Sequence, residues 1–265
     1  MASNSTGYTV VFATVVCVVC GIGVASANVA LSERQGENKK LDQQKQVLLV
    51  AGLLQPGEEV SPDEIKKRFA DNIRPEVIEL KTGNTAKVDD IAKFDQRREQ
   101  KDVATSTVPE ANMAKVLRLP NRALVYHVVK NGVTDTLILP VEGYGLWSVL
   151  YGYLALDKDA NTVKGITYYQ HAETPGLGGE VDNPKWKKDW IGRKIYDDKG
   201  AVAVHLIKGD SADPKTAPYD IDGLSGATIT SNGVTNTMRF WFEKEGFKPF
   251  LKRFKANPKP PTGGK

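Results

Sequence analysis

The chain has 265 residues, of which 40% are apolar and 26% are charged, and its formal net charge is +4. These values exclude a strongly basic nucleic-acid coat, an acidic tail protein and a wholly disordered chain, and two cysteines are too few for a disulfide-dense scaffold. The charge is unevenly distributed, because the first charged side chain is Glu33 and both cysteines precede it.

The first segment, Tyr8–Leu31, contains about 24 residues without a charged side chain. A helix that spans a membrane needs about 20 such residues, so residues 1–32 are predicted to hold a transmembrane anchor. A cleaved signal peptide is one alternative, since it fits the small residues Ala25-Ser26-Ala27, but the usual basic start is missing. A buried core helix is a second alternative, and it fits poorly because the segment has no polar face.

The residues around the anchor give conflicting indications of its orientation. Arg34, Lys39, Lys40 and Lys45 follow the anchor and no basic residue precedes it. By the positive-inside rule, this charge places the rest of the chain in the cytoplasm. The absence of cysteine after the anchor instead suits an oxidising compartment. Charge and cysteine use therefore indicate opposite sides of the membrane.

Cys17 and Cys20 form a Cys-x-x-Cys pattern, which elsewhere binds metal or performs redox chemistry. Both lie within the apolar segment, where no His, Asp or Glu is near them in the sequence. We therefore expect them to act as small apolar residues that face lipid or a partner helix.

Residues 33–105 are predicted to form a helical and mixed connecting region. The first helix is expected to continue until Gln55-Pro56-Gly57 breaks it. Ser61–Glu64 has the pattern of a capping box with proline at the first helical position, which predicts a second helix. Val77–Leu80 is expected to be a short strand, and the charged residues 86–105 are expected to form helix plus loop.

Residues 106–256 are predicted to form an α+β domain with an antiparallel or mixed sheet and flanking helices. Ala123–Val129 and Thr134–Pro140 have strand character, and Asn131-Gly132 between them is a strong hairpin signal. Further strands are predicted at Val163–Gln170 and Val202–Ile207, and Leu146–Leu156 fits either a strand or a buried helix.

The C-terminal part is predicted to form one helix over residues 231–255. Val234, Met238 and Phe242 recur four residues apart on one face of that helix. Residues 257–265 have no apolar side chains with which to form a core, so a flexible tail is expected there. The overall prediction is one anchor helix followed by a single α+β domain.

Several common kinds of site are not indicated by the sequence. It contains no P-loop, no dinucleotide-binding glycine motif between a strand and a helix, and no nucleophile elbow. The histidines His127, His171 and His205 are far apart, so we expect each to be satisfied by its own neighbours rather than to join in a metal site. No catalytic residue and no metal ligand is therefore predicted.

Two segments rich in glycine and small residues are candidates for ligand binding. Glu173–Gly179 (ETPGLGG) has the backbone freedom to turn its N–H groups toward a flat or anionic ligand, and an ordinary surface turn is the alternative. Asp222–Gly233 (DGLSGATITSNG) places small residues and hydroxyls just before the predicted helix. Such a helix start suits phosphate, and a turn with an N-cap is the alternative.

The same residues carry a resemblance to a known family. Asp222–Thr228 (DGLSGAT) matches the flavinylation motif Asp-x-x-Ser/Thr-Gly-Ala-Thr of the FMN-binding domain, and ETPGLGG matches a second landmark of that domain. The uncharged first helix, Gly143–Trp147 (GYGLW) and the C-terminal helix complete the same order. Nearly the whole chain resembles the C subunits of sodium-translocating NADH:quinone oxidoreductases.

The resemblance implies covalently bound FMN. In this family a flavin transferase joins FMN, through its phosphate, to the threonine that closes the motif, which is Thr228 here. Gly226 and Ala227 would leave room for the transferase and then the flavin. Ser225 would bond the phosphate oxygens, and Asp222 would hold the loop, serve transferase recognition or help to place Mg²⁺ during attachment.

The resemblance also implies the surroundings of the flavin ring and a function. The ring is expected to lie against Thr174, Leu177 and Gly178, with Trp147 either beside the ring or in the core. The chain would relay electrons, one at a time, through FMN, without turnover of its own. It would act in a six-subunit assembly of the bacterial inner membrane that oxidises NADH, reduces ubiquinone and pumps sodium, with the flavin domain in the periplasm.

Two other functions fit parts of the sequence. The G subunit of Rnf-type ferredoxin:NAD⁺ oxidoreductases shares the domain and the motif, but the long insertion that includes residues 56–105 favours the sodium pump. A secreted periplasmic protein, released by signal peptidase near Asn28, would instead hold FMN or another small anion in the same cradle.

Overall fold

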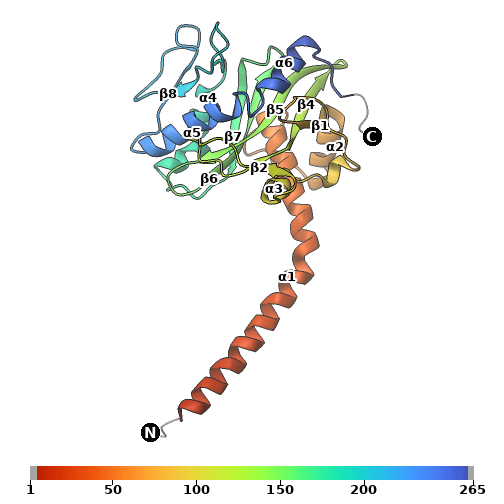
Figure 1. The fold of residues 1–265 in the computed structure, drawn as a ribbon, viewed down its shortest axis with the longest axis vertical. Coiled ribbons are helices and arrows are strands. Elements are labelled where there is room, and N and C mark those ends of the chain that lie inside the picture. Colours follow the sequence, from red (N-terminus) through yellow and green to blue (C-terminus); the bar gives the residue numbers. More distant parts are fainter. Residues whose placement is uncertain (1–4, 262–265) are drawn as a thin grey trace. The chain divides into compact units, whose positions relative to one another are not determined.

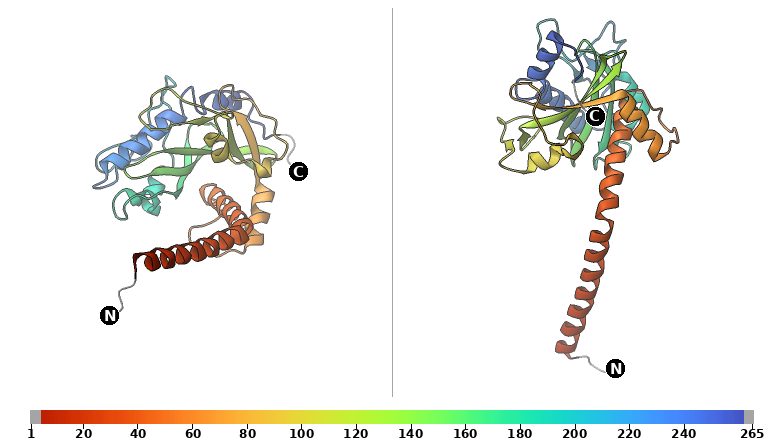
Figure 2. Two further views of the ribbon diagram at one scale, coloured as in Figure 1. Left: turned by 60° about the horizontal axis from the view of Figure 1, so that its bottom comes forward. Right: turned by 90° about the vertical axis from the view of Figure 1, so that its right-hand side faces the viewer.

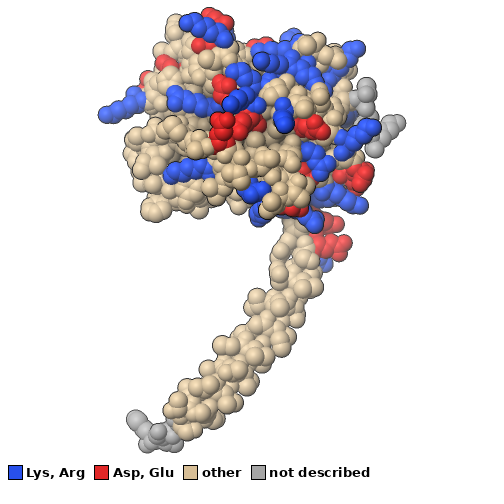
Figure 3. All heavy atoms as spheres, in the orientation of Figure 1, with Lys and Arg blue, Asp and Glu red and all other residues tan. Residues whose placement is uncertain are grey.

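The computed structural model describes residues 5–261 and divides into two compact units, residues 1–44 and 45–265 (Figure 1). The described part of the first unit is dominated by helix α1 (Thr6–Val50), which continues into the second unit. Figure 3 shows this helix uncharged over most of its length. Among the described residues, α1 alone is long and apolar enough to cross a membrane, by length and composition.

The second unit begins with the last residues of α1, of which Val47, Leu48 and Val50 are buried. The first helix therefore continues beyond the predicted anchor, as expected. It ends at Val50, a few residues before the break expected at Gln55-Pro56-Gly57.

The remaining helices are short, and the strands form one large sheet and two small pairs. The helices are α2 (Pro62–Asn72), α3 (Gln96–Lys101), α4 (Pro184–Asp189), α5 (Thr228–Trp241) and α6 (Lys248–Ala256), with 3₁₀ turns η1 (Ile91–Lys93) and η2 (Gly178–Asp182). The large antiparallel sheet has the order β1 (Ile73–Glu79), β4 (Arg122–Lys130), β5 (Val133–Tyr144), β6 (Val149–Asp157) and β7 (Val163–Gln170). The small pairs are antiparallel β2 (Ser106–Thr107) with β3 (Leu119–Pro120), and parallel β8 (His205–Leu206) with β9 (Asp220–Ile221). The predicted α+β architecture is confirmed.

The connecting region contributes a strand to the large sheet. Ser61 caps α2, since its hydroxyl accepts the N–H of Glu64 at 3.3 Å, which confirms the predicted helix start. β1 is longer than the strand predicted at Val77–Leu80 and lies at the sheet edge, where Val77 faces Leu124 of β4. η1 and α3 confirm helix plus loop in residues 86–105.

The hairpin between β4 and β5 forms as predicted. Asn131 and Gly132 have φ angles of 52° and 78°, in the left-handed region that a type I′ turn requires. Leu146–Leu156, which fitted either a strand or a buried helix, supplies most of β6, with Leu154 opposite Leu139 of β5. Its first three residues form the β5–β6 turn.

Helices cover both faces of the large sheet (Figure 2). α5 and α6 lie on one face, where Val234, Met238 and Phe242 are completely buried, so the predicted apolar helix face is confirmed. Helix α2 and the last residues of α1 lie on the other face. There Phe69 of α2 packs edge-on against Tyr126, with ring centroids 6.0 Å apart. The core is therefore divided between the two faces of one sheet.

The prediction of a single helix over residues 231–255 is wrong. The chain forms α5 and α6 with a reversal between them, and α5 begins three residues earlier, at Thr228. Gly246 lies in the reversal, and a Cβ there would be 2.1 Å from the carbonyl oxygen of Trp241. The N–H of Phe247 donates to that same carbonyl at 2.6 Å, so a local reversal that requires glycine at position 246 follows the end of α5.

Two other predicted segments differ or lie partly outside the described residues. Of the strand predicted at Val202–Ile207, only His205 and Leu206 form β8, because the rest of the segment pairs irregularly with neighbouring loops. In the predicted tail, residues 257–261 have no helix or strand, and residues 262–265 lie outside the described part of the chain.

Candidate functional site

Three segments that are far apart in the sequence meet beside the first turn of α5. They are the β5–β6 turn at residues 145–148, the glycine-rich loop at residues 173–179 and the motif at residues 222–230. The carboxylate of Glu173 joins them, because it accepts hydrogen bonds from both the turn and α5. We call Glu173, Thr230 and the turn residues 146–148 the Glu173 cluster.

The contacts of Glu173 divide between its two oxygens. Oε1 accepts the consecutive backbone N–H groups of Leu146, Trp147 and Ser148 at 3.2, 2.9 and 3.1 Å. Oε2 accepts the hydroxyl of Thr230 at 2.7 Å and also lies 3.2 Å from the N–H of Leu146. Oε1 therefore holds the turn, and Oε2 links the turn to the first turn of α5.

Glu173 is only 5% exposed, and it nevertheless favours the ionised form. Burial opposes the charge, but the hydrogen bonds from Thr230 and from the backbone of the turn outweigh it. They hold the pKa of Glu173 below its ordinary value of 4.5. A negative charge therefore lies beneath the site at neutral pH.

Two glycines make room for this carboxylate. A Cβ on Gly145 would be 2.7 Å from Glu173 Oε1, and a Cβ on Gly178 would be 2.6 Å from both Glu173 Oε2 and Thr230 Oγ1. A side chain at either position would displace the carboxylate, so Glu173 keeps the hydrogen bonds described above only with glycine at both positions.

The N-terminus of α5 has no side-chain cap, because Ala227 occupies the N-cap position. Gly226 has φ +69°, a left-handed conformation that turns the chain into the helix. Thr228 is the first residue of α5 and is exposed. The uncapped N–H groups of a helix start favour an anion, so this end of α5 suits a phosphate group.

The structure separates the hydroxyls of the motif. Thr230 is 1% exposed and donates to Glu173, and Ser231 is 7% exposed and accepts the N–H of Leu224 at 3.0 Å. Ser225 and Thr228 are exposed. Of these four hydroxyls, only those of Ser225 and Thr228 are therefore accessible to a modifying enzyme without unfolding.

Large apolar side chains are exposed on the segments that Glu173 joins. Leu146, Trp147, Leu177 and Ile229 are 40%, 65%, 43% and 57% exposed. Leu177 lies against the motif, since a Cβ on Gly226 would be 3.0 Å from Leu177 Cδ2. Trp147 is thus outside the core, and the buried alternative considered for it is wrong. The exposed apolar surface suits a flat aromatic ligand.

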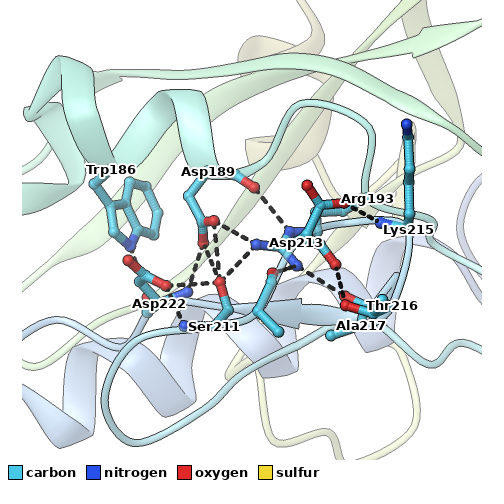
Figure 4. Close-up of polar contacts among 10 residues, drawn as sticks. Trp186, Asp189, Arg193, Ser211, Asp213, Lys215, Thr216, Ala217 and Asp222 are labelled. Atoms are coloured by element: carbon cyan, nitrogen blue, oxygen red, sulfur yellow. Dashed lines mark hydrogen bonds and ion pairs between the residues drawn. The ribbon is translucent and has the colours of Figure 1, made fainter.

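Asp222 lies in a separate polar network (Figure 4). Its Oδ1 accepts the N–H and the hydroxyl of Ser211 at 2.6 and 2.7 Å, and its own N–H donates to Asp189 Oδ2 at 2.7 Å. Arg193, which is 1% exposed, pairs with Asp189, and Trp186 Nε1 donates to the carbonyl of Asp222 at 2.9 Å. These contacts favour the loop-holding role for Asp222.

The sequence matches known proteins over nearly its whole length. Residues 145–243 match the FMN-binding domain family. The C subunit of the Na(+)-translocating NADH-quinone reductase from Pseudomonas aeruginosa is 48% identical, with 94% of this chain and 95% of that protein covered. The corresponding protein from Yersinia pestis is 42% identical, with 95% and 94% covered. NqrC from Shewanella oneidensis, whose crystal structure is known, is 37% identical in sequence. The two structures superpose with a TM-score of 0.77 over 83% of this chain and all of the Shewanella chain.

The chain belongs to the family of Na(+)-translocating NADH-quinone reductase C subunits. It is therefore a subunit of that reductase and contains an FMN-binding domain. The membership favours this reductase over the Rnf-type complex that shares the motif.

As a C subunit, the chain brings together most of the residues predicted for its site. Thr174, Leu177 and Gly178 lie in the loop that contacts the motif residues 226–230, and Trp147 lies on the turn held by the same carboxylate. Ser225, Gly226, Ala227 and Thr228 form the start of α5, whereas Asp222 faces the network around Ser211. The link that Glu173 makes between these segments was not predicted from the sequence.

The histidines are satisfied separately, as expected. His127 contacts Glu76 and Thr134, and His171 Nε2 donates to Asp182 at 2.8 Å because its Nδ1 accepts the N–H of Glu173. His205 Nδ1 contacts the carbonyl of Ala203. Within the described residues no group of three or more His, Cys, Asp or Glu side chains is arranged to hold a metal ion. Cys17 and Cys20 are exposed and form no disulfide bond.

Proposed function

We propose that this C subunit holds FMN as a phosphoester on Thr228 Oγ1 and passes electrons between neighbouring centres of the reductase. The observation that carries the proposal is the position of Thr228, an exposed hydroxyl at the uncapped start of a helix. The buried hydroxyls of Thr230 and Ser231 are engaged within the fold, so they are poorer acceptors.

The residues before Thr228 fit the phosphate of the cofactor. The first N–H groups of α5 have no side-chain cap, and the positive end of the helix dipole stabilises an anion there. Gly226 and Ala227 add little bulk beside the ester, and Ser225 is exposed and able to donate its hydroxyl. These features support a phosphate site made of Ser225, Gly226, Ala227 and Thr228.

The exposed apolar residues fit the flavin ring. Leu177 and Trp147 offer exposed apolar contact surfaces, and Thr174 and Gly178 belong to the loop that packs on α5. When bound, FMN supplies the one-electron chemistry, and the chain supplies its position, the surrounding charge and its exposure to partners. Asp222 keeps the motif in shape during attachment by the flavin transferase.

The proposal extends to the division of the chain and its location. Residues 1–32 would anchor the protein in the inner membrane, residues 33–105 would connect the anchor to the FMN-binding domain at residues 106–256, and residues 257–265 would form a tail. The domain would face the periplasm among the other subunits, where a covalent bond prevents loss of FMN.

The decisive experiment is mass spectrometry of the full chain co-expressed with a flavin transferase. The tryptic peptide 216–239 contains every hydroxyl of the motif, so fragmentation must assign the added FMN-phosphoryl mass to one residue. We expect the label on Thr228, its loss in Thr228→Val and its retention in the matched control Thr216→Val, which changes an exposed threonine of the same peptide outside the motif. An unmodified peptide, or label on Thr230, would contradict the proposal.

Location is tested separately by extraction and by reporter fusions. A protein with an intact anchor stays with the membrane after salt and carbonate washing, whereas a secreted protein becomes soluble and starts near Asn28. A periplasm-dependent reporter fused after residue 261 is expected to be active. An active cytoplasmic reporter at that position would instead support the side indicated by Arg34, Lys39, Lys40 and Lys45.

A further inference from the structure

We infer that Glu173 is a positioning residue for flavin attachment, because it sets the first turn of α5 against the β5–β6 turn. This inference rests on the proposed function, in which Thr228 is the acceptor. Glu173 does not act on Thr228 directly. Its effect passes through Thr230, which lies two residues further along the same helical turn and donates its hydroxyl to Glu173 Oε2.

The geometry shows why a single carboxylate controls both sides of the site. The turn at residues 146–148 presents three consecutive N–H groups to one oxygen, an arrangement that fixes the turn as a unit. The hydroxyl of Thr230 binds the other oxygen. Because both oxygens belong to one rigid carboxylate, displacement of α5 relative to the turn must break hydrogen bonds on one side.

The carboxylate itself has little freedom to move. Glu173 is 5% exposed, and Gly145 and Gly178 approach it so closely that a Cβ at either position would displace its carboxylate. The N–H of Glu173 also donates to His171 Nδ1 at 3.2 Å, which ties the start of the loop to a histidine paired with Asp182. Thr228 therefore projects from a helical turn whose neighbour is anchored, although Thr228 itself is exposed.

The donors to Glu173 are backbone N–H groups and hydroxyls, and all are uncharged. A buried carboxylate whose main effect is stability would pair with a cation, as Glu76 does elsewhere in the second unit. The Glu173 cluster instead has one exposed tryptophan and one exposed leucine on the turn that it holds. This arrangement orders a surface that a ligand and the transferase must both contact.

The test compares labelling rates of full-length variants in detergent with a flavin transferase. Glu173→Gln keeps the size of the side chain but removes the negative charge that accepts these hydrogen bonds, and its N–H₂ would face the N–H of Leu146. We therefore expect labelling at Thr228 to slow by about tenfold per folded molecule. Thr230→Val is expected to slow it similarly, and Thr230→Ser, which keeps the hydroxyl, is expected to restore the wild-type rate. The double variant E173Q/T230V should be no slower than the slower single variant, because the two residues act in series.

Glu180→Gln is the matched control, since Glu180 lies in the adjacent η2 and contacts Asn183 rather than α5. Thermal unfolding of each variant gives the folded fraction, so the rate per folded molecule separates positioning from stability. A wild-type rate in Glu173→Gln, equal rates in Thr230→Ser and Thr230→Val, or additive losses in the double variant would overturn the inference alone. Absence of label on the wild-type chain would overturn the proposed function, and this inference with it.

Discussion

Two buried glutamates in the second unit are held in opposite ways. Glu76 of β1 is 3% exposed and is surrounded by polar partners that include a cation: His127 Nε2 at 2.9 Å, Arg253 Nη2 at 2.7 Å and the hydroxyl of Thr85. Glu173 is 5% exposed and is held by uncharged donors of the turn and of α5. We call Glu76, Thr85, His127 and Arg253 the Glu76 cluster.

From this difference we expect the Glu76 cluster to stabilise the fold and the Glu173 cluster to order the candidate site. The Glu76 cluster joins β1, β4 and α6. In it the carboxylate of Glu76 pairs with the guanidinium of Arg253 and contacts the ring of His127. The Glu173 cluster joins a surface turn to a helix start, and no cation belongs to it. Both carboxylates tie together segments that are distant in the sequence, but Glu173 is satisfied by uncharged donors beside an exposed surface, whereas Glu76 is paired with an arginine.

The largest expected effect is that of Glu76→Ala. Removal of this carboxylate leaves Arg253 and His127 without their partner, so the free energy of unfolding should fall by about 3–5 kcal/mol. Urea unfolding measures this change, and Glu79→Ala, at an exposed position of the same strand, is the control. Labelling at Thr228 per folded molecule should stay at the wild-type rate. A loss of labelling comparable to that of Glu173→Gln would break the distinction between the two clusters.

Acid should weaken the Glu76 cluster in a defined pH range. Burial raises the pKa of Glu76, but hydrogen bonds from His127, Thr85 and Arg253 outweigh it and lower the pKa from 4.5 to about 2. A lowered carboxyl pKa contributes stability that is complete above about pH 4.5 and is lost as the pH falls toward 2.

The expected loss is about 3 kcal/mol over this interval. Urea unfolding between pH 6 and pH 2 measures this loss. In Glu76→Gln the free energy of unfolding should fall less over the same pH range, because the carboxylate is absent. Equal pH dependence in the wild type and Glu76→Gln would show that Glu76 does not keep its charge through this range.

A smaller loss of stability is expected for Glu173→Ala. The substitution leaves backbone N–H groups of the turn without an acceptor, but the turn is at the surface and water can replace the carboxylate. The free energy of unfolding should fall by about 1–2 kcal/mol, less than for Glu76→Ala. Urea unfolding of both variants in parallel decides the order, and the reverse order would contradict the comparison.

The smallest effect on stability is expected for Trp147→Ala. The side chain is 65% exposed, so the free energy of unfolding should change by less than about 0.5 kcal/mol. If Trp147 lies beside the ring, flavin fluorescence of the labelled variant should rise, because a neighbouring indole quenches it. Unchanged fluorescence would place the ring elsewhere, and Tyr8→Ala, in the other unit, serves as the control.

Local signals in the sequence predicted much of the fold. Asn131-Gly132 specified its hairpin and Ser61 specified the start of α2, because turn geometry and capping depend on a few adjacent residues. The break at Gly246 was missed although it also rests on nearby residues. Gly246 and Phe247 approach the carbonyl of Trp241 only five and six residues earlier, and Pro249 lies in the first turn of α6. The apolar residues that recur four apart continue up to this break and favoured a single helix instead.

The candidate site shows where local signals reach their limit. The motif at residues 222–228 located Thr228, because the resemblance rests on contiguous residues. The link made by Glu173 remained hidden, since Trp147 and Thr230 are 26 and 57 residues away in the sequence. A charged residue at the start of a glycine-rich loop was the one available signal, and its partners appear only when β6, β7 and α5 are assembled.

The close approach of Gly145 and Gly178 to Glu173 has a consequence for how the family diversifies. The three positions share one small volume, so a change at any of them alters what the other two accept. Relatives that replace Glu173 by a shorter residue are expected to admit alanine or serine at the positions equivalent to 145 and 178. Relatives that keep the glutamate should keep both glycines, so an alignment of many members of the family would show the three columns changing together.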